Sequence, residues 1–122
     1  MGTKDVGSKL VELCKQGKNM DAVDALYDPS IVSVEPNDSP GGPAVMKGIE
    51  AIRGKNKWFF ENHQIHSSDV KGPFENGERF AVEYRFDITP TSGPQKGKRT
   101  SMQEVAIYTV KNGKVAREEF FY

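Results

Sequence analysis

Glu35 is the side chain of this sequence whose position best suits it to move a proton. It closes the β-branched run 31–35 and is followed at once by Pro36. Alternate residues of a strand share a face, so Glu35 is expected to lie with Ile31 and Ser33. An apolar cavity disfavours an unpaired carboxylate and favours the protonated acid, which suits a general acid or base. A solvated glutamate at a strand end is the structural alternative.

Glu118 is a second carboxylate that the sequence places among other polar and aromatic side chains. Asn112-Gly113 is a strong signal for a two-residue type I′ hairpin. The regular register of that hairpin places Ile107 opposite Glu118. The residues expected on the same face as Glu118 then include Gln103, Val105, Phe120 and Tyr122. A carboxylate near Glu35 could share a proton with it, whereas an ion pair across the sheet is the alternative.

His63 lies on the apolar stripe of a predicted helix, where it could be a proton carrier or a hydrogen-bonded core residue. His63 and His66 form an HxxH pattern. That pair straddles a helix end and a strand, and no third ligand completes a metal-site pattern, so we expect no metal and no cofactor. The lone Cys14 is expected to be a buried small hydrophobe. The residues expected to line a binding pocket are Trp58, Tyr84, Gln103, Val105, Phe120 and Tyr122, with packing in the core as the alternative. Tyr84, Gln103 and Tyr122 are potential donors to an oxyanion, with a structural role as the alternative.

The elements that must hold these residues follow from periodicity and turn signals. Apolar spacing predicts helices within residues 3–17, 19–28 and 49–62. The loop 36–48 is rich in proline and glycine, which excludes regular structure except for a short strand over 44–47. The remaining expected strands cover residues 31–35, 63–71, 78–89, 99–110 and 115–122. Asn76-Gly77 is a further hairpin signal.

Size and charge restrict the classes of function. The chain has 122 residues, which predicts one domain over 1–122. Seventeen basic and seventeen acidic residues give no net charge, so a nucleic-acid partner is not expected. No apolar run approaches the length of a membrane span, and the N-terminus lacks an apolar signal core. We therefore expect a cytoplasmic protein with no membrane partner.

The order of these elements resembles the nuclear transport factor 2-like superfamily, and within it the SnoaL-like and ketosteroid isomerase-related small proteins. The segments that carry the resemblance are LYDPSIVSVEP, KGIEAIRG and NGKV. The resemblance spans nearly the whole chain and implies an α+β fold, in which a cone-shaped curved antiparallel sheet wraps three helices around an apolar pocket. The superfamily includes isomerases, polyketide cyclases, dehydratases, epoxide hydrolases and non-catalytic modules, so the fold alone assigns no reaction.

The functional residues of ketosteroid isomerase carry over only in part. Its general-base aspartate corresponds to Glu35, whereas its two oxyanion donors correspond to Leu10 and Val105, which cannot donate. The resemblance implies an apolar small-molecule ligand. An enzyme of this kind would isomerise, cyclise or dehydrate a carbonyl compound, with Glu35 moving the proton and Glu118, His63 or Tyr122 assisting. A non-catalytic binding or assembly module is the alternative. The mixed outer face of the sheet predicts a homodimer.

Overall fold

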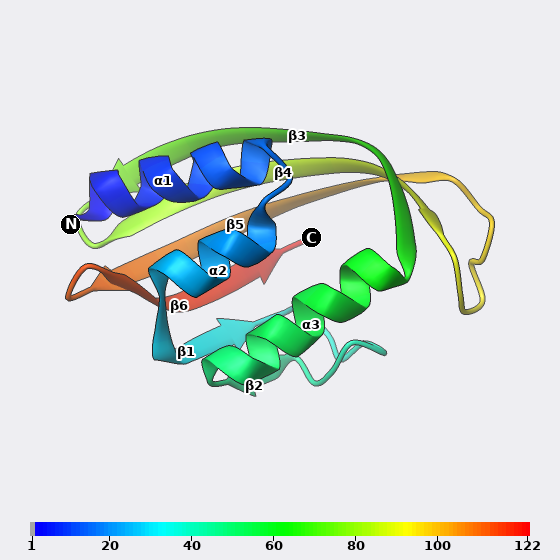
Figure 1. The fold of residues 1–122 in the computed structure, drawn as a ribbon, viewed down its shortest axis with the longest axis horizontal. Helices are drawn as coiled ribbons and strands as arrows, with labels where there is room; N and C mark the ends of the chain where they lie inside the picture. Colours follow the sequence, from blue (N-terminus) through cyan, green and yellow to red (C-terminus); the bar gives the residue numbers. More distant parts are fainter. Residues whose placement is uncertain (1) are drawn as a thin grey trace.

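In the part of the chain that the structure describes, one curved sheet of six strands carries three helices over one of its faces (Figure 1). The computed structural model describes residues 2–122. The strand order is β2-β1-β6-β5-β4-β3, in which β1 and β6 are parallel and the other neighbours antiparallel. The elements, in chain order, are α1 (Thr3–Lys15), α2 (Asn19–Leu26), β1 (Tyr27–Val34), β2 (Val45–Lys47), α3 (Ile49–Glu61), β3 (His63–Asn76), β4 (Arg79–Pro90), β5 (Thr100–Lys111) and β6 (Lys114–Phe121). The predicted α+β fold is confirmed.

Helix α1 packs against β3 and β4 through the predicted apolar stripe. Val6, Leu10 and Cys14 on this stripe are buried. The helix ends where Gly17 adopts a φ of +74°, a left-handed conformation that glycine takes at little cost. The N–H of Gly17 donates to the carbonyl of Cys14, which satisfies one of the free carbonyls at the helix end. None of the helices in the described part of the chain is long and apolar enough to cross a membrane.

The core lies between the helices and the inner face of the sheet. The predicted alternation along β4 is confirmed, because every second side chain from position 80 to position 88 is buried: Phe80, Val82, Tyr84, Phe86 and Ile88. These residues pair directly with alternate residues of β5, so the two strands share one inner face. That inner face is the wall on which the candidate site is built.

The second hairpin has the predicted turn but not the predicted register. Asn112 and Gly113 both have positive φ, at 53° and 75°, as a type I′ turn requires. Val110 pairs with Val115, but the next pair joins Thr109 to Arg117. Ala116 is therefore an extra residue, and a one-residue bulge separates the turn from the rest of the hairpin.

The bulge moves every later side chain of β6 to the face opposite the expected one, because the side chains of a strand alternate. Tyr108, not Ile107, faces Glu118, and Val105 faces Phe121. The expectation that Gln103 and Val105 share a face with Glu118 is therefore wrong. Those two residues lie on the outer face. The residues of β5 on the inner face are Met102, Glu104, Ala106 and Tyr108.

Three other boundaries differ from the expectation. Strand β1 begins at Tyr27 rather than at Ile31, directly after helix α2. Strand β3 continues to residue 76, well past the expected end at residue 71. At the first hairpin Asn76 pairs with Arg79, so the two turn residues are Gly77 and Glu78 rather than Asn76 and Gly77. Glycine with a φ of +63° at the first turn position replaces the expected asparagine–glycine pair.

Candidate active site

A cavity of about 280 Å³ lies between the three helices and the inner face of the sheet. Most of its wall is apolar or aromatic, as is usual where a protein holds a small organic ligand. The apolar wall includes Leu10, Val23, Trp58, Phe59, Phe60, Phe86, Met102 and Phe120. The polar groups on the wall come from all three helices, from the loop after β1 and from strands β1, β3, β4, β5 and β6, and several of them gather at one side.

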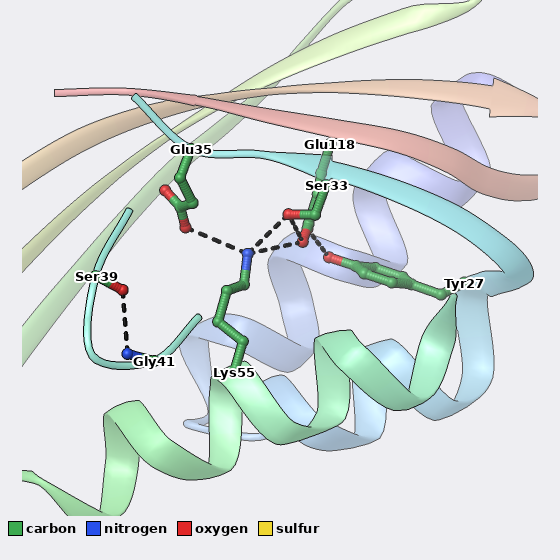
Figure 2. A network of polar contacts seen from close by, with 7 residues as sticks. All are labelled: Tyr27, Ser33, Glu35, Ser39, Gly41, Lys55 and Glu118. Atoms are coloured by element: carbon green, nitrogen blue, oxygen red, sulfur yellow. Dashed lines mark hydrogen bonds and ion pairs between the residues drawn. The ribbon is translucent and has the colours of Figure 1, made fainter. Parts of the chain in front are cut away.

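Lys55 of α3 is the centre of the polar cluster (Figure 2). Its Nζ donates to Ser33 Oγ at 2.7 Å, to Glu35 Oε1 at 3.2 Å and to Glu118 Oε1 at 3.3 Å. An ammonium group has three N–H bonds, so these acceptors use all of them. The Nζ also lies 4.6 Å from the centre of the Phe120 ring. Lys55 is not among the residues singled out from the sequence, yet its side chain is only 12% exposed.

Glu118 of β6 is held from three sides and is 2% exposed. Its Oε1 accepts from Lys55 and, at 2.9 Å, from the hydroxyl of Ser33. Its Oε2 accepts from the hydroxyl of Tyr27. Burial and the nearby charge of Glu118 raise the pKa of Tyr27 well above its usual value, so Tyr27 remains a donor. Glu118 is therefore a fixed acceptor within the cluster.

Glu35 has one occupied and one free carboxylate oxygen. Its side chain is 18% exposed, and Oε1 accepts from Lys55. Oε2 is buried and has no hydrogen-bond partner within residues 2–122. Tyr122 lies nearby on the cavity wall, and partial burial together with the charge of Glu35 raises its pKa to about 12. A ligand in the cavity could supply the donor that Glu35 Oε2 lacks.

Glu104 of β5 is a third carboxyl on the wall, and sequence reasoning missed it. Burial, together with the negative charge of Glu35, raises the pKa of Glu104 to about 7, although Lys55 opposes this rise. Glu104 faces Tyr84 directly across the β4–β5 pair. The missing signal was the alternation of Met102, Ala106 and Tyr108 along β5, which places position 104 on the inner face.

Comparisons with known proteins agree with this architecture. The family model for the SnoaL-like domain matches residues 1–122. The chain belongs to the SnoaL-like family. A search of curated proteins found no match.

Solved structures place this SnoaL-like protein in the same fold group. A Mesorhizobium loti protein, described as a candidate SnoaL-like polyketide cyclase and also labelled a carbohydrate phosphatase, is 41% identical over 100% of both chains, with a TM-score of 0.91. A nuclear transport factor 2-like protein from Burkholderia thailandensis is 16% identical over 99% of this chain and 90% of its own, with a TM-score of 0.80. A Xanthomonas campestris protein with a cystatin-like fold is 14% identical with the same coverage and a TM-score of 0.75.

The cavity of this SnoaL-like protein brings together most of the residues singled out from the sequence: Glu35, Trp58, His63, Tyr84, Glu118, Phe120 and Tyr122. Gln103 and Val105 are absent from its wall, for the register reason given above. Leu10, which corresponds to an oxyanion donor in ketosteroid isomerase, lines the cavity as an apolar residue.

His63, the first residue of β3, contacts the end of helix α3. Its Nδ1 is 2.8 Å from the carbonyl oxygen of Phe59, and its ring stacks on that of Phe59 at 4.4 Å. His66 is exposed and its Nε2 contacts the hydroxyl of Thr89 at 2.7 Å, so the two histidines do not converge. Within residues 2–122, no group of three or more histidine, cysteine, aspartate or glutamate side chains is arranged to hold a metal ion.

Proposed function

We propose that this protein is a cofactor-free acid–base enzyme that isomerises, cyclises or dehydrates a carbonyl compound, with Glu104 as the proton carrier. The observation that carries the proposal is a carboxyl group on the wall of an apolar cavity with a pKa of about 7. A general acid or base is most effective when its pKa lies near the working pH. The likeness to a candidate polyketide cyclase supports carbonyl chemistry.

The other polar groups support this division of roles. Glu35 is tied to Lys55 through one oxygen, and its free Oε2 can accept a hydrogen bond from the substrate or assist the proton transfer. Glu118 and Lys55 satisfy one another within the cluster, so their part is to set the local charge and hold Glu35 in place. In the proposed step, Glu104 takes a proton from the carbon beside the carbonyl and returns it elsewhere on the substrate.

The same geometry argues against phosphate ester chemistry. Within residues 2–122, Lys55 is the one lysine or arginine on the cavity wall, and its three N–H bonds already serve Ser33, Glu35 and Glu118. Three carboxyl groups on the wall would repel a phosphate group. An uncharged carbonyl compound with an apolar body suits this cavity better.

Proton exchange measures the proposed activity directly. Benzoylacetone, an aromatic β-diketone, is incubated in D₂O with the protein, and deuterium uptake beside the carbonyls is followed by mass spectrometry. We expect the wild type to accelerate uptake and Glu104→Gln to lower that rate by about 10²- to 10⁴-fold. Glu119→Gln, on the outer face of β6, is the control and should exchange at the wild-type rate. Wild-type exchange no faster than in buffer would refute the enzyme and favour a non-catalytic binding module.

A further inference from the structure

Three hydrogen-bonding side chains on the cavity wall form a chain that is separate from the Lys55 cluster. Tyr84 Oη of β4 lies 2.7 Å from Tyr108 Oη of β5, and it also lies 3.8 Å from Cys14 Sγ of α1. All three side chains are buried, with 4%, 2% and 6% exposure respectively. All three line the cavity. The cavity wall therefore includes three side chains that carry polar atoms.

Cys14, Tyr84 and Tyr108 have one more donor proton than their mutual contacts can use. Two hydroxyls and one thiol carry three protons, and the two contacts among them use at most two. Within residues 2–122 these side chains make no further hydrogen bond. Burial raises the pKa of both phenols well above their usual value, so both retain their protons. One proton is thus left over, and it belongs to a tyrosine hydroxyl whenever the Cys14 thiol donates to Tyr84 Oη.

The two tyrosines lie beside the carboxyl groups of the cavity wall, which indicates that the acceptor of the remaining proton is a ligand in the cavity. Tyr84 directly faces Glu104 on the neighbouring strand, and Tyr108 directly faces Glu118. Side chains paired in this way have Cβ atoms about 4.5–5.5 Å apart. A ligand in contact with the hydroxyl pair therefore also lies within reach of Glu104.

We propose that Tyr84 and Tyr108 form the subsite that holds the carbonyl oxygen of the substrate. This rests on the proposed acid–base function. When Glu104 removes the proton beside the carbonyl, the C–H electron pair forms a carbon–carbon double bond. The C=O π electrons then move onto the oxygen. The hydroxyl pair donates a hydrogen bond to that oxygen without giving up its proton, and the bond strengthens as negative charge develops. The pair thus supplies the donor that Leu10 and Val105 cannot. The ligand class is an enolisable aryl ketone, because the aromatic rings of Trp58, Phe59, Phe60, Phe86 and Phe120 also line the cavity.

The infrared stretch of a bound ketone tests this contact. Acetophenone labelled with ¹³C at its carbonyl is the probe, since a hydrogen bond to the oxygen lowers the stretching frequency. We expect a lowered frequency in the wild type and a return toward the value in an apolar solvent in Tyr84→Phe and Tyr108→Phe. Loss of one hydrogen bond should also weaken binding by about three- to tenfold. Thr109→Val, which removes a hydroxyl from the outer face of β5, should match the wild type.

The outcomes separate this subsite from the proposed reaction. A wild-type frequency retained in both phenylalanine variants, or no acetophenone binding to the wild type, would overturn the subsite, whatever the exchange assay shows. A lowered frequency that persists in Glu104→Gln would support it even if proton exchange fails. If either phenylalanine variant does not fold, NMR spectra of the wild type labelled with ¹³Cζ-tyrosine test the subsite instead. Acetophenone should then shift the resonances of Tyr84 and Tyr108, and shifts confined to Tyr27 and Tyr122 would refute the subsite.

Discussion

Charge is distributed unevenly around the cavity at the scale of single residues. Three carboxyl groups, those of Glu35, Glu104 and Glu118, share the wall with one ammonium group. Lys55 contacts the first and the last of these, within 3.3 Å of each. Glu104 has no ion pair within residues 2–122, and burial, followed by the negative charge of Glu35, raises its pKa to about 7. Two of the three carboxyl groups thus belong to the ion cluster, and the third is the one to which the proposed function gives proton transfer.

The first prediction concerns how stability depends on pH through Glu104. Its pKa rises from 4.5 to about 7 on folding, so the folded protein holds this proton more tightly than the unfolded chain does. As pH increases through that range, the unfolded state ionises first and stability falls, by about 3 kcal/mol in total above pH 7. Glu104→Gln has no ionisable group at this position and should therefore lack this pH-dependent loss of stability. Urea unfolding should therefore show that the free energy of unfolding of Glu104→Gln, relative to that of the wild type, is larger at pH 8 than at pH 5. A stability difference that does not change with pH would contradict the burial of this carboxyl.

The second prediction concerns Lys55 as an internal cation. Lys55→Met leaves Glu118, which is 2% exposed, without its charge partner. Removing one member of a buried pair costs about 3–5 kcal/mol in unfolding free energy. Lys57→Met is the matched control on the same helix, since Lys57 is 72% exposed and pairs only with the exposed Glu61. That change should cost less than about 1 kcal/mol. Equal losses in the two variants would mean that Lys55 is effectively solvated.

At the scale of elements, the loop after β1 is fixed by its approach to helix α3. A Cβ built on Gly41 would lie 2.8 Å from Cε3 of Trp58, closer than real contacts allow. Gly41→Ala should therefore displace the loop and the indole ring at a cost of about 1–3 kcal/mol. The emission of Trp58, the one tryptophan in the sequence, should shift at the same time.

Gly54 provides the matched control for this prediction. It lies on α3 with nothing within 4 Å of an added Cβ. Gly54→Ala should therefore raise the stability by about 0.5–1 kcal/mol through helix propensity and leave the Trp58 emission unchanged. An unaltered emission in Gly41→Ala would show that the loop does not rest on the ring.

The sequence could predict the elements better than their exact registration. The turn at Asn112-Gly113 and the alternation along β4 depend only on neighbouring residues, so both could be predicted from the sequence. The bulge at Ala116 is not local, because it depends on how β6 must twist to pair with β1 on its other edge. Because the bulge was not predicted, Gln103 and Val105 were assigned to the face of Glu118, and Glu104 was assigned to the opposite face. The burial of Lys55 was not predicted because lysine is usually exposed. Its spacing from Ile52 and Phe59 nevertheless places it on the buried stripe of α3.

At the scale of the whole molecule, the outer face of the sheet has an apolar strip that the fold does not cover. Cross-strand pairing places Phe74 beside Ala81 and Ala81 beside Ile107, and it places Val105 beside Phe121. Phe74 is 63% exposed and Phe121 is 51% exposed. Large exposed aromatic side chains on a sheet face are typical of a surface that pairs with another chain.

We propose that two copies of the chain pair through this strip to form a homodimer. Light scattering at micromolar concentration should give a mass of two chains for the wild type. Phe121→Ser should give one chain, because it removes a large aromatic anchor from the strip without touching the cavity wall. Lys57→Met, on the helix side of the molecule, should remain a dimer. A monomeric wild type, or a Phe121→Ser variant that stays dimeric, would show that this strip is not the interface. Because Phe120 lines the cavity next to Phe121 on β6, a dimer of this kind would also hold the strand that carries Glu118 in place.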